Sequence, residues 1–76
     1  MIQELEMVAL AADIPEHGLR SEDVGTVVLA HGKAGCEVEF LTLTGETLAV
    51  VSLSMGKIRA INRREIAHAR PLGRTA

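Results

Sequence analysis

The side chains of this sequence with the widest chemical range are one cysteine, Cys36, and three histidines, His17, His31 and His68. A cysteine nucleophile needs a base within hydrogen-bond reach and a third group that orients the base. Cys36 with His17 and His68 would supply the parts of a thiol hydrolase. His31 and Cys36 flank the turn HGKAG and would form half of a metal site. A structural zinc site takes four ligands, and no nearby pair completes this one.

Neither arrangement is the interpretation that the sequence favours. A domain of 76 residues has little room for the concave pocket that catalysis requires. A surface histidine beside a small buried cysteine is the ordinary alternative. We therefore predict no catalytic residue, no metal, no cofactor and no small-molecule substrate.

Positive charge gathers at the C-terminal end of an acidic chain. Residues 1–55 hold nine acidic side chains against Arg20 and Lys33, whereas residues 56–76 hold six basic side chains against Glu65 alone. Clustered basic side chains can bind the phosphates of duplex nucleic acid, although the acidic remainder would repel them. The alternatives are a solvated face, pairing with the acidic body, and an acidic protein partner. The candidate basic patch is Arg59, Arg63, Arg64 and Arg70.

The composition excludes several classes of ligand and location. The chain is 47% apolar, yet Phe40 is its one aromatic residue. Surfaces that stack bases or bind polyproline need aromatic rings, so single-stranded nucleic acid and polyproline are disfavoured. One cysteine cannot close an intrachain disulfide, which suits a reducing cytoplasm. The sequence shows no signal-peptide pattern and no apolar run near the roughly 20 residues of a membrane span. We expect a cytoplasmic protein.

The elements that must position these residues are short strands with alternating polarity, separated by turns that contain glycine. In CEVEF, Cys36, Val38 and Phe40 point to one side and two glutamates to the other. LAVVSL is the predicted strand after CEVEF, across a turn at Thr44–Glu46, and VGTVVLA is the predicted strand before it. ELEMVALAADI also alternates, although its composition suits a helix as well. IRAINR or EIAHAR can form a last short strand.

These strands predict an all-β fold. Short strands that must cover one another do best as a small barrel. We predict a single SH3-like barrel of about five antiparallel strands over residues 1–70, with a short basic C-terminal segment and a frayed tail at 71–76. Gly25 precedes the strand that has to bend, where a missing side chain permits a close approach or a bulge.

Two of the predicted strands carry more apolar residues than one barrel interior can use. In LAVVSL both sides are apolar, and ELEMVALA shows the same property. A strand buried on both faces needs cover, here from the C-terminal segment or from another subunit. The candidate protein interface, on the second apolar face, is Val8, Leu10, Ala49, Val51 and Leu53.

The loop IPEHGL is a second candidate for binding, because small barrels often present their partners with loops. The ordinary interpretation is a turn whose Ile14 and Leu19 tuck beneath the barrel mouth. The two interpretations are compatible. The candidate binding loop is Ile14, Pro15, Glu16, His17 and Gly18.

Three motifs connect the chain with a known family: an Asp-Ile-Pro-Glu-x-Gly-Leu loop at 13–19, an Asp-Val-Gly-Thr-Val-Val strand at 23–28 and a Glu-Val-Glu-Phe strand at 37–40. On these motifs the chain resembles the bacterial domain-of-unknown-function family 4926 over nearly its whole length. The resemblance implies a small SH3-like barrel, often encoded beside a second small protein in a toxin–antitoxin-like pair. It implies no catalytic residues. Cys36 stands where members usually have an aromatic residue, which makes this core smaller.

The function that follows is a non-enzymatic protein–protein interaction module, either the antitoxin-like member of a bacterial gene pair or a homo-oligomer. The alternative is a nucleic-acid-binding accessory module that uses the basic C-terminal segment. Salt separates the two hypotheses, because phosphate contacts weaken steeply with salt whereas apolar interfaces tolerate it.

Overall fold

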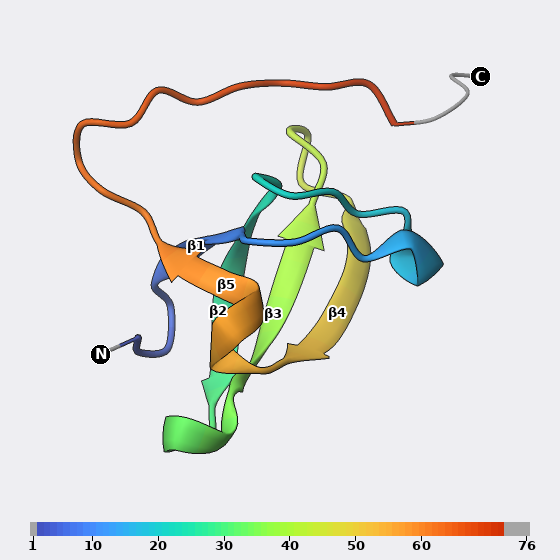
Figure 1. The fold of residues 1–76 in the computed structure, drawn as a ribbon. Helices are drawn as coiled ribbons and strands as arrows, with labels where there is room; N and C mark the ends of the chain where they lie inside the picture. Colours follow the sequence, from blue (N-terminus) through green and yellow to red (C-terminus); the bar gives the residue numbers. More distant parts are fainter. Residues whose placement is uncertain (1, 73–76) are drawn as a thin grey trace.

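The computed structural model describes residues 2–72 and contains five antiparallel strands in one curved sheet (Figure 1). The strands are β1 (Met7–Leu10), β2 (Val24–Ala30), β3 (Cys36–Leu41), β4 (Thr47–Leu53) and β5 (Ile58–Ala60). Single 3-10 turns lie in the connections: η1 (Pro15–His17), η2 (Gly32–Ala34) and η3 (Met55–Lys57). The predicted all-β class is confirmed.

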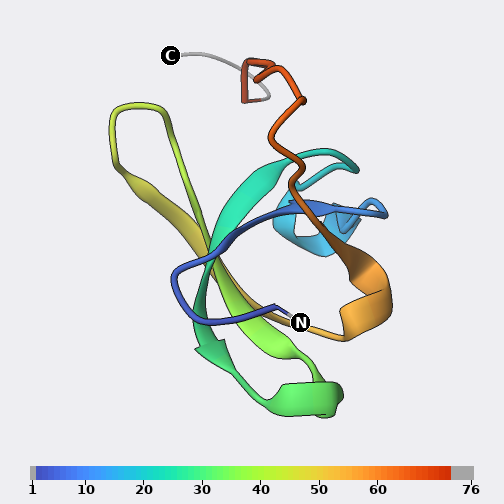
Figure 2. The same cartoon turned by 90° about the vertical axis from the view of Figure 1, so that its left-hand side faces the viewer.

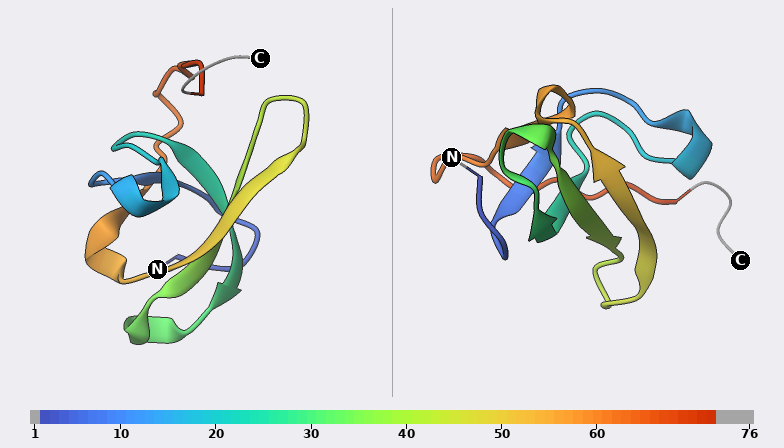
Figure 3. Two further views of the ribbon diagram at one scale, coloured as in Figure 1. Left: turned by 90° about the vertical axis from the view of Figure 1, so that its right-hand side faces the viewer. Right: turned by 90° about the horizontal axis from the view of Figure 1, so that it is seen from below.

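The sheet has the order β4-β3-β2-β1-β5, and every neighbouring pair is antiparallel. The chain meanders from β1 to β4 and then returns through η3 to place β5 beside β1. Together with the strong curl of the sheet in Figures 2 and 3, this order matches the predicted small barrel. Within residues 2–72 the two edge strands, β4 and β5, are each paired on one side, so the barrel is open between them.

The predicted hairpin across Thr44–Glu46 is confirmed. β3 and β4 pair with Val38 opposite Val51, and the Thr42 N–H closes the turn by donating to the carbonyl of Glu46 at 2.8 Å. Directly opposed residues of an antiparallel pair share one face of the sheet. The burial of Val38 therefore determines that Val51 also points into the core.

The core fills the concave side of the sheet. Among the described residues, no polar or charged side chain is buried, and aliphatic side chains surround the Phe40 ring. A Cβ at Gly25 would lie 2.5 Å from the Val38 side chain and 2.9 Å from the Phe40 ring. The close approach predicted at Gly25 is therefore confirmed, whereas the register shift of β2 lies between Val27 and Leu29.

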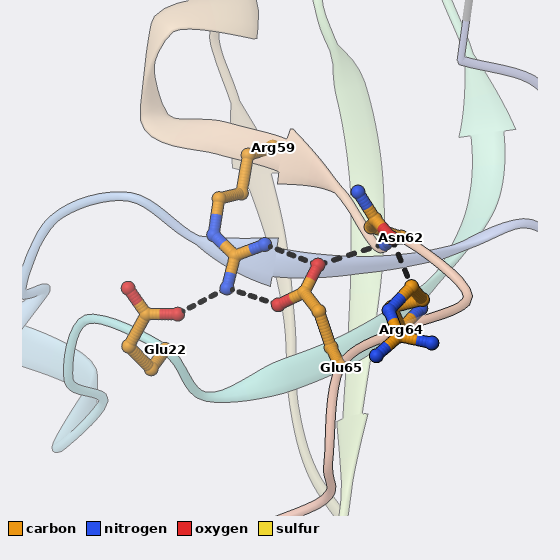
Figure 4. A network of polar contacts seen from close by, with 5 residues as sticks. All are labelled: Glu22, Arg59, Asn62, Arg64 and Glu65. Carbon is orange, nitrogen blue, oxygen red and sulfur yellow. Dashed lines mark hydrogen bonds and ion pairs between the residues drawn. The ribbon is translucent and has the colours of Figure 1, made fainter.

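The first strand is shorter than its alternating pattern, because its ladder covers only Met7–Leu10; single backbone hydrogen bonds, from Leu5 to Val27 and from Ala11 to Lys57, continue on either side of it. Ala9 faces away from the buried Val8, yet it is only 2% exposed. Ala9 lies opposite Arg59 of β5. The Arg59 side chain crosses β1 to reach Glu22, in the turn just before β2 (Figure 4). The second face of β1 is thus covered by this same chain.

The last strand uses IRAINR, at Ile58–Ala60, in place of the EIAHAR alternative. Residues 61–72 then run as an extended segment past one end of the barrel toward the β3–β4 hairpin (Figure 1). We call residues 61–72 the C-terminal segment. Of the tail predicted to fray at 71–76, residues 73–76 lie outside the described residues. Within residues 2–72, no helix is long and apolar enough to cross a membrane.

The predicted protein interface is wrong about which face points outward. Four of its five residues are buried in the core and the fifth is half-buried: Val8, Leu10, Val51, Leu53 and Ala49. The reason is the register with β3, which turns this face of β4 inward. The apolar side chains that remain outside on β4 are Leu48, 41% exposed, and Val50, 53% exposed.

Candidate interaction surface along β4

The free edge of β4 is long and unprotected. Within residues 2–72, β4 pairs with β3 alone, and its seven residues, TLAVVSL, include no charge and no proline. Proteins usually protect edge strands with charges, proline or short length, because an open edge pairs readily with another strand. The other edge strand, β5, has three residues and carries Arg59. β4 is therefore the less protected of the two edges.

A groove borders the free edge of β4, between this strand and the loop that contains η1. One half has a volume of about 520 Å³ and lies between Val50–Leu53 and the Asp13–His17 part of the loop. The other half, of about 540 Å³, lies between Leu48 and the same loop, with Leu72 of the C-terminal segment. Asp13 and His17 line both halves. We call the two halves together the β4 groove.

The hydrophobic core is least covered where it meets the β4 groove. Ile14, Val51 and Leu53, which all line the groove, are 7%, 7% and 8% exposed. By contrast, Val38 is fully buried and Phe40 is 2% exposed. An apolar side chain inserted into the groove would therefore contact the core itself.

An apolar hollow of about 600 Å³ lies between the β3–β4 hairpin and the C-terminal segment. Five of its apolar lining side chains are each at least 40% exposed. Exposed apolar side chains that gather at one place mark an interaction surface, whereas single scattered ones do not. These side chains are Val24, Leu41, Leu43, Leu48 and Leu72.

Arg70 holds the C-terminal segment against the barrel. Its Nε donates to Oδ1 of Asp23 at 2.8 Å, and its Nη2 donates to Oδ2 of Asp23 and to the carbonyl of Gly18 at 3.1 Å. This hydrogen-bonded ion pair is the main reason that the pKa of Asp23 lies below its ordinary value, and partial burial opposes the shift. Arg70 also lines both the apolar hollow and the β4 groove. The ion pair therefore positions one wall of each.

Acid should weaken this ion pair. Because the pKa of Asp23 is lowered in the folded protein, the pair stabilises the fold above the ordinary value of 3.8, and the stabilisation is lost as the pH falls below it. Arg70→Gln should lower the free energy of unfolding near neutral pH by about 1 kcal/mol, since water still reaches both side chains.

Urea unfolding of the wild type and of Arg70→Gln, near neutral pH and at about pH 3, measures this difference. We expect the gap in stability between the two proteins to narrow in acid. A gap that is unchanged by pH would show that the Asp23–Arg70 pair does not stabilise the fold.

A second ion-pair network fixes the start of the C-terminal segment (Figure 4). Arg59 donates to Glu65 at 2.9 Å and forms an ion pair with Glu22, and the backbone N–H of Asn62 donates to the same Glu65 carboxylate at 2.8 Å. The hydrogen bond from Arg59 lowers the pKa of Glu65, and the Glu65 carboxylate raises the pKa of Arg59. The network anchors residues 62–65 to the edge of β5.

The candidate basic patch is consequently divided. Arg59 and Arg70 are engaged by carboxylates of the same chain, whereas Arg63 and Arg64 are exposed. The pairing of the basic segment with an acidic body, one of the alternatives that the sequence left open, is thus realised for two of the four arginines.

Comparison with known families places the chain in a family of unknown function. Residues 4–60 match the family described as Domain of unknown function (DUF4926). The matched range contains all five strands and the loop with η1 that borders the β4 groove. The chain belongs to the DUF4926 family. No curated protein and no solved structure matches it. The match ends at Ala60, so the C-terminal segment and Arg70 lie beyond the DUF4926 range.

The candidate catalytic and metal-ligating side chains of this DUF4926 member have different surroundings. Cys36 is buried in the core, and burial raises the pKa of its thiol. His31 Nε2 lies 3.2 Å from Oε2 of Glu37. His17 lines the β4 groove, whereas His68 lines the apolar hollow. No group of three His, Cys, Asp or Glu side chains that could hold a metal ion occurs in the described part of the chain.

The candidate binding loop is partly structural. Ile14 and Leu19 are buried and exchange two backbone hydrogen bonds, of 2.9 and 3.1 Å, as the turn interpretation predicts. Gly18 ends η1 with a φ of +68°. Glu16 and His17 are exposed beside the β4 groove. The loop therefore forms the wall of the groove that faces β4.

Sequence reasoning missed three residues of this surface: Leu48, Val50 and Asp23. Leu48 and Val50 were visible as one side of an alternating strand, and the pairing of Val51 with Val38 was the signal that would have placed them outside. Asp23 carried no local signal, because its partner lies 47 residues away.

Proposed function

We propose that this DUF4926 protein is a non-enzymatic protein–protein interaction module that binds its partner along β4. The observation that carries the proposal is the uncharged free edge of β4 beside a groove that is lined by the least covered side chains of the core. Leu48 and Val50 extend this surface with exposed apolar side chains. A patch of this kind is an association site more often than a solvated surface.

The expected energy of such a contact is appreciable for a small domain. Complete burial of a Leu or Val side chain contributes about 1.5–3 kcal/mol relative to full exposure. Leu48 and Val50 are 41% and 53% exposed, so covering the remainder contributes about 1 kcal/mol each. The apolar hollow next to Leu48 adds further area.

The alternative functions have less support. A cysteine nucleophile needs a lowered pKa and access to substrate, whereas Cys36 is buried and the pKa of its thiol is raised. Phosphate binding needs free positive charge, whereas Arg59 and Arg70 are engaged by carboxylates of the same chain. Both observations favour a protein partner.

Two kinds of protein partner suit the proposal. One is a second copy of the chain, and the other is the product of a neighbouring gene, for which this protein would be the antitoxin-like member of the pair. The lone buried cysteine suits a reducing cytoplasm, where we place the protein.

Light scattering of the purified protein, alone and mixed with the neighbouring gene product, tests the proposal. We expect a particle heavier than the 8.1 kDa monomer that persists as salt is raised, because apolar contacts tolerate salt. A monomer under both conditions is the result that would refute the proposal. If that monomer bound duplex DNA with a steep salt dependence, the nucleic-acid alternative would replace it.

A further inference from the structure

The backbone N–H and C=O groups on the free edge of β4 indicate how this strand would contact a partner; the inference rests on the proposed function. In an antiparallel strand, alternate N–H and C=O groups point to opposite edges. Within residues 2–72, β3 is the only segment whose backbone pairs with the β4 backbone. The groups on the other edge of Thr47–Leu53 are therefore available to a further strand.

The β4 groove lies where such a strand would be added, and apolar side chains line part of it. Neighbouring strands lie about 4.7–4.9 Å apart, so a strand added to β4 would occupy the groove between β4 and the η1 loop. Its side chains would alternate between two environments. One set would face Ile14 and Val51 at the accessible margin of the core, and the other would continue the outer face beyond Val50.

The charge around β4 indicates which kind of segment fits. Residues 4–60 hold nine acidic and four basic side chains, a net charge of −5. Four carboxylates border β4: two on the η1 loop, one opposite Val50 on β3 and one in the β3–β4 turn. Within residues 2–72 none of the four forms an ion pair. They are Asp13, Glu16, Glu39 and Glu46. Two basic side chains outside any ion pair of the described residues, Lys57 and Arg20, also line the β4 groove, and Arg70 is paired with Asp23, so the carboxylates exceed the unpaired basic groups by two.

Like charges across an interface oppose association, and opposite charges select a partner. A second copy of this chain would bring the same acidic residues to the contact, whereas a basic segment would pair with them. We propose that β4 binds an extended segment of a partner protein by strand addition, and that this segment carries lysine or arginine at alternate positions. Small apolar side chains between the basic ones would fill the groove against Ile14 and Val51.

Synthetic peptides test this inference on the full-length protein. The probe is a short peptide that alternates valine with lysine, and the matched control alternates valine with glutamate. A third peptide repeats the valine–lysine sequence with methyl groups on alternate backbone nitrogens, which removes the donors of one edge. Amide hydrogen exchange followed by NMR reports which backbone groups become protected.

We expect the valine–lysine peptide to slow exchange of the β4 amides that point away from β3. Methylation should weaken binding by roughly tenfold or more, because it removes several donors and each net hydrogen bond contributes up to about one decade of affinity. Val50→Lys should weaken binding of the valine–lysine peptide by repulsion, whereas Ile66→Lys, at an exposed position on the C-terminal segment, should not.

Equal binding of the lysine and glutamate peptides would overturn the charge assignment. Binding that leaves β4 exchange unchanged, or that methylation does not weaken, would overturn strand addition, and so would the absence of binding. If the partner protein forms a complex without protecting β4 amides, strand addition is wrong and the interaction function stands. If the peptide protects β4 while light scattering finds only monomers, the interaction function fails instead.

Discussion

Phe40→Ala is expected to remove most of the stability of this domain. Phe40 is the single aromatic residue of the chain and is 2% exposed in the core. Truncation of a buried phenylalanine to alanine costs about 3–5 kcal/mol, through lost apolar burial and the cavity left behind. At about 0.05–0.15 kcal/mol per residue, a chain of this length has about 4–11 kcal/mol in total.

Urea unfolding followed by circular dichroism measures the loss. Leu43→Ala is the matched control, because Leu43 is 93% exposed and belongs to the adjoining turn. An exposed truncation of this kind usually changes stability by no more than about 0.5 kcal/mol. Similar urea midpoints for the two variants would mean that the Phe40 ring is not a core residue.

Gly35→Ala is expected to have a comparably large effect, for two independent reasons. Gly35 adopts φ +127° and ψ −155°, a conformation that is essentially restricted to glycine. An added Cβ would also collide with the backbone carbonyl of Leu53. That carbonyl cannot easily retreat, because Leu53 is paired with Cys36 in the sheet. Strain and collision together should cost about 3–5 kcal/mol.

Gly32→Ala separates the collision from the general cost of a positive φ. Gly32 lies in the same turn with φ +62°, and a Cβ there would meet no atom within 4 Å. The left-handed conformation alone should cost alanine about 1–2 kcal/mol. Equal losses of unfolding free energy in the two variants would show that contact with Leu53 contributes nothing.

The strands were predictable from the sequence because alternation and turns are local properties. CEVEF and the turn at Thr44–Glu46 predicted the β3–β4 hairpin, and Gly25 of β2 predicted the close approach of β2 to β3. The extent of β1 was not predictable from alternation. The strand ends at Leu10 although the pattern continues to Ala11, because the antiparallel partners β2 and β5 begin opposite this point, at Val24 and Ile58.

The candidate surface was only half predictable. Alternation divided β4 into two sides, but the choice of the inward side follows from the pairing of Val51 with Val38, which is a property of two strands. The Asp23–Arg70 pair joins residues 47 positions apart, so no local pattern predicts it. For the same reason, the sequence left open what covers the second face of β1, whereas the structure places Arg59 there.

The most direct test of the β4 surface is the affinity of the partner protein for a variant with both exposed β4 side chains replaced. Leu48→Gln with Val50→Gln keeps the strand uncharged and removes the apolar contacts, and Ile66→Gln is the control at an exposed apolar position elsewhere. Titration calorimetry with the complex-forming protein, or self-association if the complex is homomeric, should show a loss of about 30-fold for the double variant. The control should bind like the wild type. A folded double variant with undiminished affinity would contradict a binding surface along β4.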